Sequence, residues 1–569
     1  MPPPFGFHGK AVSGRFTIPS GIVTVTLDTI ELLAREISAL GILTTKSIGP
    51  VPRVGNPEPV FSQMRGGTFV NAVGLANPGC DEFASELAEV KLPEDKFLLI
   101  SIFGGTPEDF QKVAGTLAPY ADGFELNFSC PHAEGYGQEI GTEAEIARDY
   151  LKAVKAVTDK PVMPKLSPNV GDLEPLAAAL IEAGADGFTV INTSGPIEFK
   201  EPLTGEPAIS NRVGGISGTE IKSEALRCIS QVAKAIRKSG RELPILGMGG
   251  IQTAEDVRQF EAAGASFFGV GSALSGMDTC ELKRTFTALE KGEDDAIEIS
   301  PDLMQFKKFH VARVDRPAAD LAILWTEENF QCEPGQFVFV WLPGDMEKPF
   351  APAFDTPNAL VARAVGPFTK ALCKLEPGDA FYMRGPYGTQ FDALPDPAPD
   401  AYCLVGGGTG IAPLLLLAKR LSDHSPADRI HVFLGGRSAN QVYFQEEFQQ
   451  YAMLHIATDD GSAGFHGFVT QLLEKFLESR PEQTYQFYNC GPERMEKPAF
   501  EIQRRHPHTG IQTSVERYMK CGVGICGICA MDGLRTCVDG PVLSEAFIQC
   551  SNQFGHTHRT KTGELEPIE

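Results

Sequence analysis

The chain has 569 residues, and its formal net charge of −23 at pH 7 disfavours a nucleic-acid partner, because phosphate binding requires a basic surface. Its length exceeds the size at which one hydrophobic core stops growing, so we expect about three or four domains. A hydrophobic content of 42% and a charged content of 22% argue against disorder, and the sequence has no apolar run of about 18 residues that could span a membrane.

The thirteen cysteines mostly stand singly within apolar segments. This usage suits a reducing cytosol better than a disulfide framework. The N-terminal MPPPFGFHGK has neither the long apolar core nor the cleavage site of a secretion signal. We therefore expect a cytoplasmic protein.

Residues 1–300 repeat an apolar strand followed by a helical stretch. Counting GRFTIPSGIV near the start, about eight such units in roughly 300 residues predict a TIM barrel, whose catalytic groups lie at the carboxyl ends of the strands. GMGG and GVGS end the last two strands, where such barrels commonly bind a phosphate. The other strands are LGILTTKS (40–47), FLLISIFG (97–104), ADGFELNFS (121–129), PVMPKLS (161–167) and GADGFTVINT (184–193). The residues that punctuate the strand ends are Lys46, Asn127, Lys165, Asn192, Gly249 and Gly271.

Cys130 directly follows one of these strands, in NFSCPH. A free cysteine is most often a small core residue. Its place at the end of a barrel strand makes it a candidate catalytic group as well. The residues alone leave both interpretations open.

Residues 303–400 change pattern, to short alternating strands separated by Pro and Gly turns, which predicts a small antiparallel barrel. Residues 401–512 alternate strands and helices, which predicts an open doubly wound sheet. There CLVGGGTGIAP (403–413) runs from an apolar strand into a glycine-rich turn and a helix, an arrangement that can hold a pyrophosphate. The turns at 435–438 and 489–495 support this interpretation; the alternative is tight turns without a ligand.

Four cysteines cluster near the end of the chain in the spacing C-x4-C-x2-C-x7-C. This is the plant-type ferredoxin spacing for a [2Fe–2S] cluster. Gly522, Gly524 and Gly527 fit a loop that must adopt positive φ angles around a cluster. A structural zinc site is the alternative, although such sites usually pair two C-x2-C knuckles across a longer gap. The cysteines are Cys521, Cys526, Cys529 and Cys537.

Two sets of motifs resemble a known family. In the N-terminal half they are TKS (45–47), PRVGNPEP (52–59), NAVGLANPG (71–79), ELNFSCP (125–131), PKLSPNV (164–170), GADGFTVINT (184–193) and GGISG (214–218). In the C-terminal half they are GPYG (385–388), GGGTGIAP (406–413), TDDGSAGFHGFVT (458–470), CGPERM (490–495) and CGVGICGICAMDGLRTCVDGPV (521–542). The first half resembles the catalytic subunit of class 1 dihydroorotate dehydrogenases. Residues 304–569 resemble the electron-transfer subunit of the NAD-dependent class 1B members.

The resemblance implies oxidation of dihydroorotate to orotate in pyrimidine biosynthesis, with electrons passing from FMN through a [2Fe–2S] cluster to FAD and NAD. It implies that Cys130 is the general base. The implied substrate-binding residues are Lys46, Asn71, Asn127, His132, Asn192 and Thr193. The implied FMN-binding residues are Ser20, Gly21, Lys46, Ser47, Asn127, Lys165, Ile191, Gly215, Ser217, Gly249, Gly250, Gly271 and Ser272. Those implied for FAD and NAD are Lys348, Pro349, Phe350, Thr369, Gly385, Gly388, Gly406, Gly407, Gly408, Thr409, Gly410, Cys490 and Gly491. The four clustered cysteines would bind iron.

The resemblance also implies a domain order and an assembly. We expect an FMN-binding barrel over 1–300, an FAD-binding barrel over 303–400, an NAD-binding domain over 401–512 and a cluster domain over 513–569. Met304 resembles the start of a separate protein, which suggests a gene fusion with its junction at Glu290–Asp302. The family implies a homodimer, with neither membrane nor nucleic acid as a partner.

Two positions depart from the family's usual pattern. The flavin motif ends in Ala351 where a serine hydroxyl is common, and His132 stands where many relatives have a substrate-binding asparagine. His132 also suggests dihydropyrimidine dehydrogenases, which carry SCPH but have additional [4Fe–4S] motifs that this sequence lacks. A tRNA-binding dihydrouridine synthase conflicts with the acidic charge, and a flavoprotein module without turnover is the non-enzymatic alternative. Arg437 alone does not decide between NAD and NADP.

Overall fold

The computed structural model describes residues 5–128, 141, 143–293 and 297–568. The chain divides into two compact units, which are described separately. The first unit comprises Met1–Met304, Val523–Arg535 and Arg559–Leu565. The second comprises Gln305–Gly522, Thr536–His558 and Glu566–Glu569.

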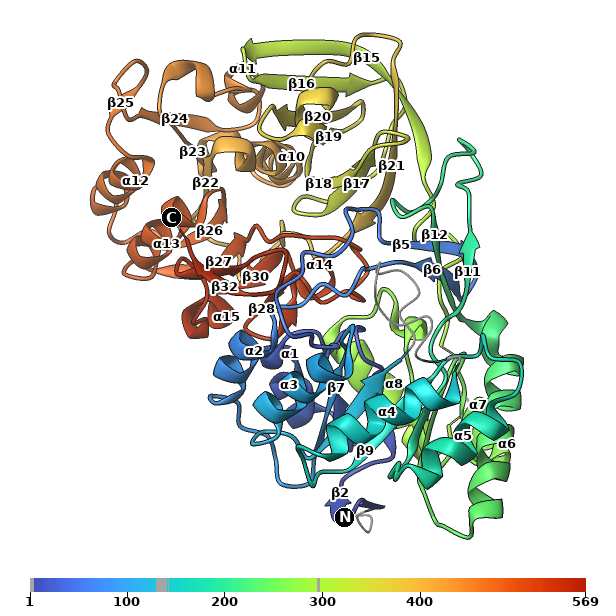
Figure 1. Cartoon of the computed structure of the whole chain (residues 1–569). Coiled ribbons are helices and arrows are strands. Elements are labelled where there is room, and N and C mark those ends of the chain that lie inside the picture. The colour runs from blue at the N-terminus through green and yellow to red at the C-terminus, as the bar shows by residue number, and fades with distance from the viewer. Residues whose placement is uncertain (1–4, 129–140, 142, 294–296, 569) are drawn as a thin grey trace. The chain divides into compact units, whose positions relative to one another are not determined.

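The first unit is built on a barrel of eight parallel strands (Figure 1). The strands follow the order β3-β14-β13-β10-β9-β8-β7-β4, and a parallel bridge between Phe16 and Leu40 joins the two ends of this series. The predicted TIM-type barrel is therefore confirmed. The strands are β3 (Phe16–Thr17), β4 (Ile42–Thr44), β7 (Phe97–Ile102), β8 (Gly123–Asn127), β9 (Val162–Leu166), β10 (Phe188–Val190), β13 (Ile245–Met248) and β14 (Phe267–Gly269).

Amphipathic helices surround these strands and bury their apolar faces. In α7 (Ala254–Ala263), for example, Thr253 and Asp256 form a capping box at the start, and Gly264, with φ of +119°, ends the helix. The other helices of this layer are α1 (Leu27–Glu36), α2 (Cys80–Leu87), α3 (Pro107–Leu117), α4 (Ala144–Lys155), α5 (Leu173–Glu182), α6 (Lys222–Ser239) and α8 (Thr279–Lys291).

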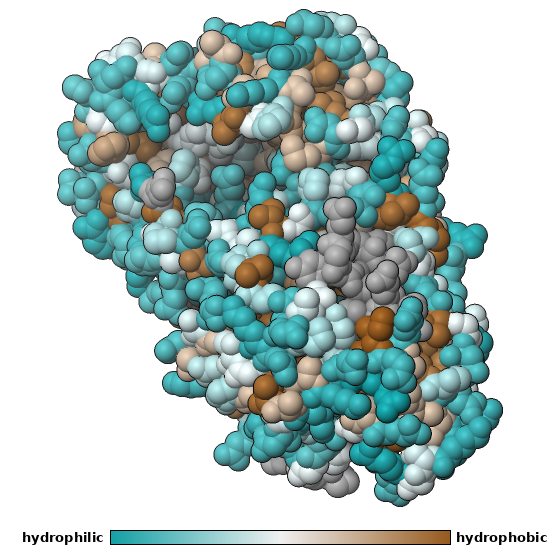
Figure 2. Space-filling model, viewed as in Figure 1, coloured by the Kyte–Doolittle hydropathy of each residue, from teal (hydrophilic) through white to brown (hydrophobic). Residues whose placement is uncertain are grey.

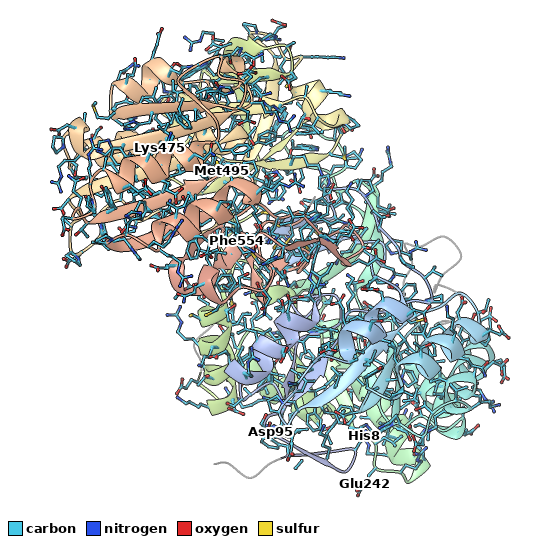
Figure 3. All side chains as sticks on the ribbon, turned by 90° about the vertical axis from the view of Figure 1, so that its left-hand side faces the viewer. His8, Asp95, Glu242, Lys475, Met495 and Phe554 are labelled. Atoms are coloured by element: carbon cyan, nitrogen blue, oxygen red, sulfur yellow. The ribbon has the colours of Figure 1, made fainter. Side chains whose placement is uncertain are left out.

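The N-terminal end of the barrel is closed by the hairpin of β1 (Phe5–Phe7) and β2 (Lys10–Val12), where Phe7 packs with Phe97 and Phe267. Figure 3 shows His8 of this hairpin at the same end as Asp95 and Glu242, which precede β7 and β13. The carboxyl ends of the strands therefore face the opposite way, where the fold places functional groups.

The first unit also contains a four-stranded antiparallel sheet that the sequence did not predict. It has the order β11-β12-β6-β5 and is formed by two separate excursions of the chain. In it, Asn71 pairs in register with Gly215. Its strands are β5 (Phe61–Arg65), β6 (Thr68–Asn71), β11 (Ser194–Glu198) and β12 (Val213–Gly218).

The second unit begins with a seven-stranded antiparallel sheet in the order β18-β17-β21-β15-β16-β20-β19, as the alternating pattern predicted. Its apolar interior includes Phe309, Val340 and Phe381. The one helix that interrupts this series of strands is α9 (Pro367–Leu372), between β20 and β21. The strands are β15 (Lys307–Ala318), β16 (Leu321–Thr326), β17 (Phe337–Trp341), β18 (Glu347–Phe350), β19 (Pro352–Asp355), β20 (Asn358–Arg363) and β21 (Ala380–Tyr387).

The second sheet of this unit has the order β25-β24-β23-β22-β26-β27-β30, and all its strands are parallel except the last (Figure 1). The doubly wound sheet is thus confirmed, while its antiparallel edge strand, which comes from the C-terminal region, was not foreseen. The strands are β22 (Ala401–Gly407), β23 (Ile430–Gly436), β24 (Met453–Thr458), β25 (Phe465–His466), β26 (Tyr485–Cys490), β27 (His508–Ser514) and β30 (Val542–Ser544). The helices are α10 (Ile411–Ser422), α11 (Gln445–Gln449), α12 (Val469–Glu478) and α13 (Glu493–Gln503).

One piece of the cluster loop packs on the barrel as part of the first unit. Val23 N donates to Ile525 O at 2.7 Å, and Gly276 N donates to Val523 O at 2.9 Å. This piece contains β28 (Ala530–Met531) and β29 (Leu534–Arg535), and it places Ile525 and the next residue beside the barrel's pocket.

On the face shown in Figure 2, hydrophilic residues predominate and hydrophobic residues form small separate groups. Within the described residues, no helix is both long and apolar enough to cross a membrane.

Candidate active site

A pocket opens at the carboxyl ends of the barrel strands and encloses about 1360 Å³ of empty space, part of it open to solvent. Most residues that the sequence assigned to substrate and FMN line this one pocket. They are Ser20, Gly21, Lys46, Ser47, Asn71, Asn127, Lys165, Ile191, Asn192, Thr193, Ser217, Gly249, Gly250, Gly271 and Ser272.

Three predicted residues are not among those that line the pocket. Gly215 lies next to it, where an added Cβ would come within 2.2 Å of Thr193 Oγ1, so only glycine fits there. Cys130 and His132 lie outside the described residues. Conversely, Phe61, Gln252 and Cys526 line the pocket without having been predicted to do so.

The parallel strands explain why residues so far apart in sequence meet. Asn127 ends β8 and pairs in register with Lys165 of β9. Because every barrel strand runs the same way, the residues at their carboxyl ends share one rim. Asn71 comes instead from the four-stranded sheet, where its Nδ2 donates to Gly215 O at 3.3 Å.

The polar side chains of the pocket are linked by hydrogen bonds. Asn127 Nδ2 donates to Ser47 Oγ at 3.0 Å, and Asn192 Nδ2 donates to Asn127 Oδ1 at 3.4 Å. Asn192 Oδ1 in turn accepts from Thr193 N at 2.8 Å. The orientation of both amides is therefore fixed, so the pocket presents a defined set of donors and acceptors.

Lys165 supplies a positive charge to this pocket. Its side chain is only 4% exposed, and its Nζ lies 3.5 Å from Glu125 Oε1. Gly249 and Gly250 adopt φ of +117° and +94°, a backbone that places peptide groups rather than side chains at this rim. An ammonium in a buried pocket and a glycine rim on the phosphate-binding strands fit a flavin mononucleotide.

The second unit has the geometry of a nucleotide site where β22 ends. This strand lies between β23 and β26, so helices leave the sheet on opposite faces here, at the position where such sheets bind ligands. A Cβ at Gly410 would come within 2.5 Å of Cys490 O, so the glycine-rich turn and the turn after β26 approach too closely for a side chain. Burial raises the pKa of the Cys490 thiol. Gly491 N donates to Glu496 Oε1 at 2.9 Å, which fixes the backbone of this turn.

The residues assigned to FAD lie in the part of the second unit that forms the seven-stranded antiparallel sheet. Lys348, Pro349 and Phe350 belong to β18, where Lys348 Nζ lies over the Tyr518 ring at 5.3 Å. Thr369 caps the start of helix α9. Its Oγ1 accepts from the N–H groups of residues 365 and 366 at 3.1 and 3.0 Å. Its proposed contact with FAD therefore has to compete with this cap.

The clustered cysteines are all buried, with exposed fractions of 1–6%. Gly522, Gly524 and Gly527 have φ of +77°, +72° and +65°, as a loop that wraps around a cluster requires. Burial of four cysteines within 17 residues, among left-handed glycines, suits thiolate ligation of an iron–sulfur cluster.

Three family models match the sequence. The dihydroorotate dehydrogenase model matches residues 6–291. The chain belongs to the dihydroorotate dehydrogenase family. The oxidoreductase NAD-binding domain matches residues 404–500, and the iron–sulfur cluster binding domain of dihydroorotate dehydrogenase B matches residues 516–546.

The relatives found are catalytic subunits of dihydroorotate dehydrogenase B (NAD(+)). The chain is 43% identical to that of Pyrococcus abyssi over 257 residues, which is 45% of this chain and 82% of the relative. It is 41% identical to that of Bacillus mycoides over 240 residues, or 42% of this chain and 75% of the relative. A solved structure of an NADH-dependent reduced ferredoxin-NADP oxidoreductase aligns with 42% of the chain, at 26% identity and a TM-score of 0.37. One chain thus combines the catalytic domain with an NAD-binding and an iron–sulfur domain.

Proposed function

We propose that the chain oxidises dihydroorotate to orotate in pyrimidine biosynthesis and transfers the electrons to NAD. The observation that carries this proposal is the pocket of the barrel, whose lining combines the asparagine network, Lys165 and Cys526 of the cluster loop. A substrate site and a proposed ligand of the electron carrier in one lining would give the electrons a short path from the flavin to the cluster.

The pocket residues suit the substrate's functional groups. Dihydroorotate carries alternating N–H and C=O groups, which the amides of Asn71, Asn127 and Asn192 and the Thr193 hydroxyl can match. Lys46, which is 8% exposed, can neutralise the substrate carboxylate. Cys130 is proposed as the base that removes the C5 proton, which it would do best as a thiolate.

Each cofactor has a proposed set of holders. FMN, bound by the residues that line the barrel pocket, would accept the hydride from C6. Lys165 would stabilise negative charge that develops there. The four cysteines would hold a one-electron [2Fe–2S] carrier. The glycine-rich turn and Cys490–Gly491 would position NAD, and the antiparallel barrel would bind FAD. We assign FMN binding to residues 1–300, FAD binding to 303–400, NAD binding to 401–512 and the iron–sulfur cluster to 513–569.

The direct test is anaerobic titration of the purified protein with dihydroorotate, followed by flavin bleaching, with dihydrouracil as the comparison. We expect dihydroorotate to reduce the flavin and dihydrouracil to do so poorly. A carboxylate contact with a charged partner is worth about 1.5–3 kcal/mol, or roughly a ten- to hundredfold preference. Equal or faster reduction by dihydrouracil would instead assign the site to dihydropyrimidines, the activity that His132 suggests.

The role of Cys130 needs its own variant. Cys130→Ala should still bind FMN and orotate but reduce FMN about 10²–10⁴-fold more slowly, the usual contribution of a positioned base. A near-wild-type single-turnover rate would exclude Cys130 as the base. We further propose a cytoplasmic homodimer, which light scattering would test as a mass of twice 61.4 kDa.

A further inference from the structure

Glu125 is a charged residue inside the barrel to which none of the roles above applies. It lies on β8, two residues before Asn127, and its side chain has no exposed surface. Its Oε1 accepts from Ser101 Oγ at 2.9 Å and lies 3.5 Å from Lys165 Nζ. Its Oε2 has no hydrogen-bond partner in the part of the chain that the structure describes. A buried carboxylate is costly without a counter-charge, so Glu125 and Lys165 depend on each other.

A chain of hydrogen bonds leads from Glu125 to the pocket. Ser101 Oγ lies 2.9 Å from Ser47 Oγ, which lies 3.0 Å from Ser20 Oγ and accepts from Asn127 Nδ2 at 3.0 Å. Ser101 and Glu125 are fully buried, so water does not compete for these bonds.

The carboxylate decides the direction of every bond in this chain. An ionised carboxylate only accepts, so Ser101 must donate its single proton to Glu125 and can only accept from Ser47. Ser47 donates its only hydroxyl proton to Ser101, so both of its lone pairs accept, one from Ser20 and one from Asn127. Asn127 is thereby forced to direct its Oδ1 towards Asn192, and Asn192 directs its own Oδ1 towards Thr193 N.

We infer that Glu125 is a positioning residue that sets both the donor–acceptor pattern of the pocket and the charge that the flavin experiences. Through Ser101 and Ser47 it fixes the orientation of the Asn127 amide, with Nδ2 towards Ser47 and Oδ1 towards Asn192. Through its ion pair it compensates the positive charge of Lys165. This inference rests on the proposed function and deepens it, because it concerns the same pocket.

Glu125→Gln tests both consequences in the holoenzyme. A neutral amide leaves Lys165 uncompensated, which favours the negatively charged reduced flavin. The midpoint potential of the orotate-sensitive flavin should therefore rise, by about 30 mV for a tenfold change in the two-electron equilibrium. The glutamine can also donate to Ser101, which removes the fixed direction of the chain, so orotate should bind about tenfold more weakly, as read from the flavin spectrum.

Two further variants separate these effects from simple structural damage. Ser101→Ala breaks the chain but keeps the ion pair, so it should weaken orotate binding without moving the potential. Thr44→Val removes a buried hydroxyl from another strand of the same barrel, one that pairs with Thr17 Oγ1 at 2.8 Å rather than with the chain, and should leave both readouts unchanged.

Wild-type potential and orotate affinity in Glu125→Gln, or equal changes in Thr44→Val, would overturn the inference. If Glu125→Gln does not fold, Ser101→Ala decides. Unchanged orotate binding in that variant would contradict the proposed role of the hydrogen-bond chain. Failure of the proposed function is distinguishable, because it appears in the wild type as no reduction by dihydroorotate and no orotate binding. In that case, a flavin potential that rises in Glu125→Gln but stays unchanged in Ser101→Ala and Thr44→Val still tests Glu125 through its ion pair with Lys165.

Discussion

Replacing Arg384 by methionine should destabilise the seven-stranded antiparallel sheet of the second unit more than any surface change. The Arg384 side chain is 1% exposed, and its Nε and Nη2 donate to the two carboxylate oxygens of Glu347 at 2.8 and 2.7 Å. Its Nη1 donates to Tyr387 Oη at 2.9 Å, and its guanidinium lies over the Phe339 ring at 4.2 Å. Arg384 thus ties β18 to β21, the strands that carry the KPFA and GPYG motifs.

The magnitude follows from what the substitution leaves behind. Arg384→Met removes the guanidinium that balances the charge of the fully buried Glu347 carboxylate, and breaking one side of such a pair costs about 3–5 kcal/mol. Glu347→Met should cost a similar amount by stranding the guanidinium. The double variant should recover most of this loss, because apolar side chains of similar volume replace buried ion pairs at little or no cost. The coupling free energy of the cycle should therefore be about 3 kcal/mol or more.

Tryptophan fluorescence reports on this barrel alone. The chain has two tryptophans, Trp325 and Trp341, and they lie on β16 and β17. For m of roughly 2 kcal/mol per molar urea, each single variant should lower the fluorescence midpoint by about 2 M. Single losses below about 1 kcal/mol, or a double variant as unstable as the sum of the singles, would refute this reasoning.

Three further changes probe the electron path, the pH dependence and the barrel. Cys526→Ser should abolish NAD reduction but leave the flavin reducible by dihydroorotate, and survival of both reactions would remove the cluster from the path. Burial and the neighbouring His455 lower the pKa of His431 from 6.5 to about 4. The unfolded chain therefore binds more protons between these values, and stability decreases as the pH is lowered through this range. His431→Phe should flatten the decline in urea midpoint between pH 7.5 and 5, whereas the same change at exposed His424 should not. Lys96→Met should lower the free energy of unfolding of the first unit by about 2–4 kcal/mol, because Lys96 Nζ donates to one hydroxyl and to buried carbonyls at 2.8–3.0 Å. Unfolding in urea would be monitored through the release of FMN. A loss below about 0.5 kcal/mol would contradict this reasoning.

The sequence predicted the strands with a clear apolar run or an apolar–polar alternation and missed short strands that have neither. Barrel strands such as FLLISI are buried throughout and almost entirely apolar, because helices or the barrel interior cover both faces. The four-stranded sheet escaped prediction because FSQMR and SGPIE contain too few apolar residues to stand out. Asn71, which the motif NAVGLANPG singled out as a substrate-binding residue without any knowledge of its strand, nevertheless lines the pocket.

Buried charges show where sequence reasoning stops. Glu125 interrupts the apolar strand ADGFELNFS, and the two-residue period of a strand places it on the same face as Asn127. This position could be read from the sequence. The pairing of Glu125 with Lys165 could not, because only the register of β8 against β9 brings Lys165 next to Asn127, and register is a tertiary property. Glu347 and Arg384 likewise give no sign of pairing across 37 residues.

Such pairs add little net stability, since desolvation offsets their attraction. Their positions therefore call for another explanation. Lys165 lines the barrel pocket, with Glu125 paired to it from inside the barrel, and Glu347 and Arg384 lie on the strands that carry the FAD motifs. Glu493 and Arg517 join the CGPERM turn to the residues just before Cys521. A fixed charge in a medium of low dielectric shifts the potential of a nearby carrier far more than the same charge in water does. If that is their role, the double methionine variant of Arg384 and Glu347 should fold almost as stably as the wild type and yet show an altered FAD potential. An unchanged potential would mean that the pair only holds the strands together.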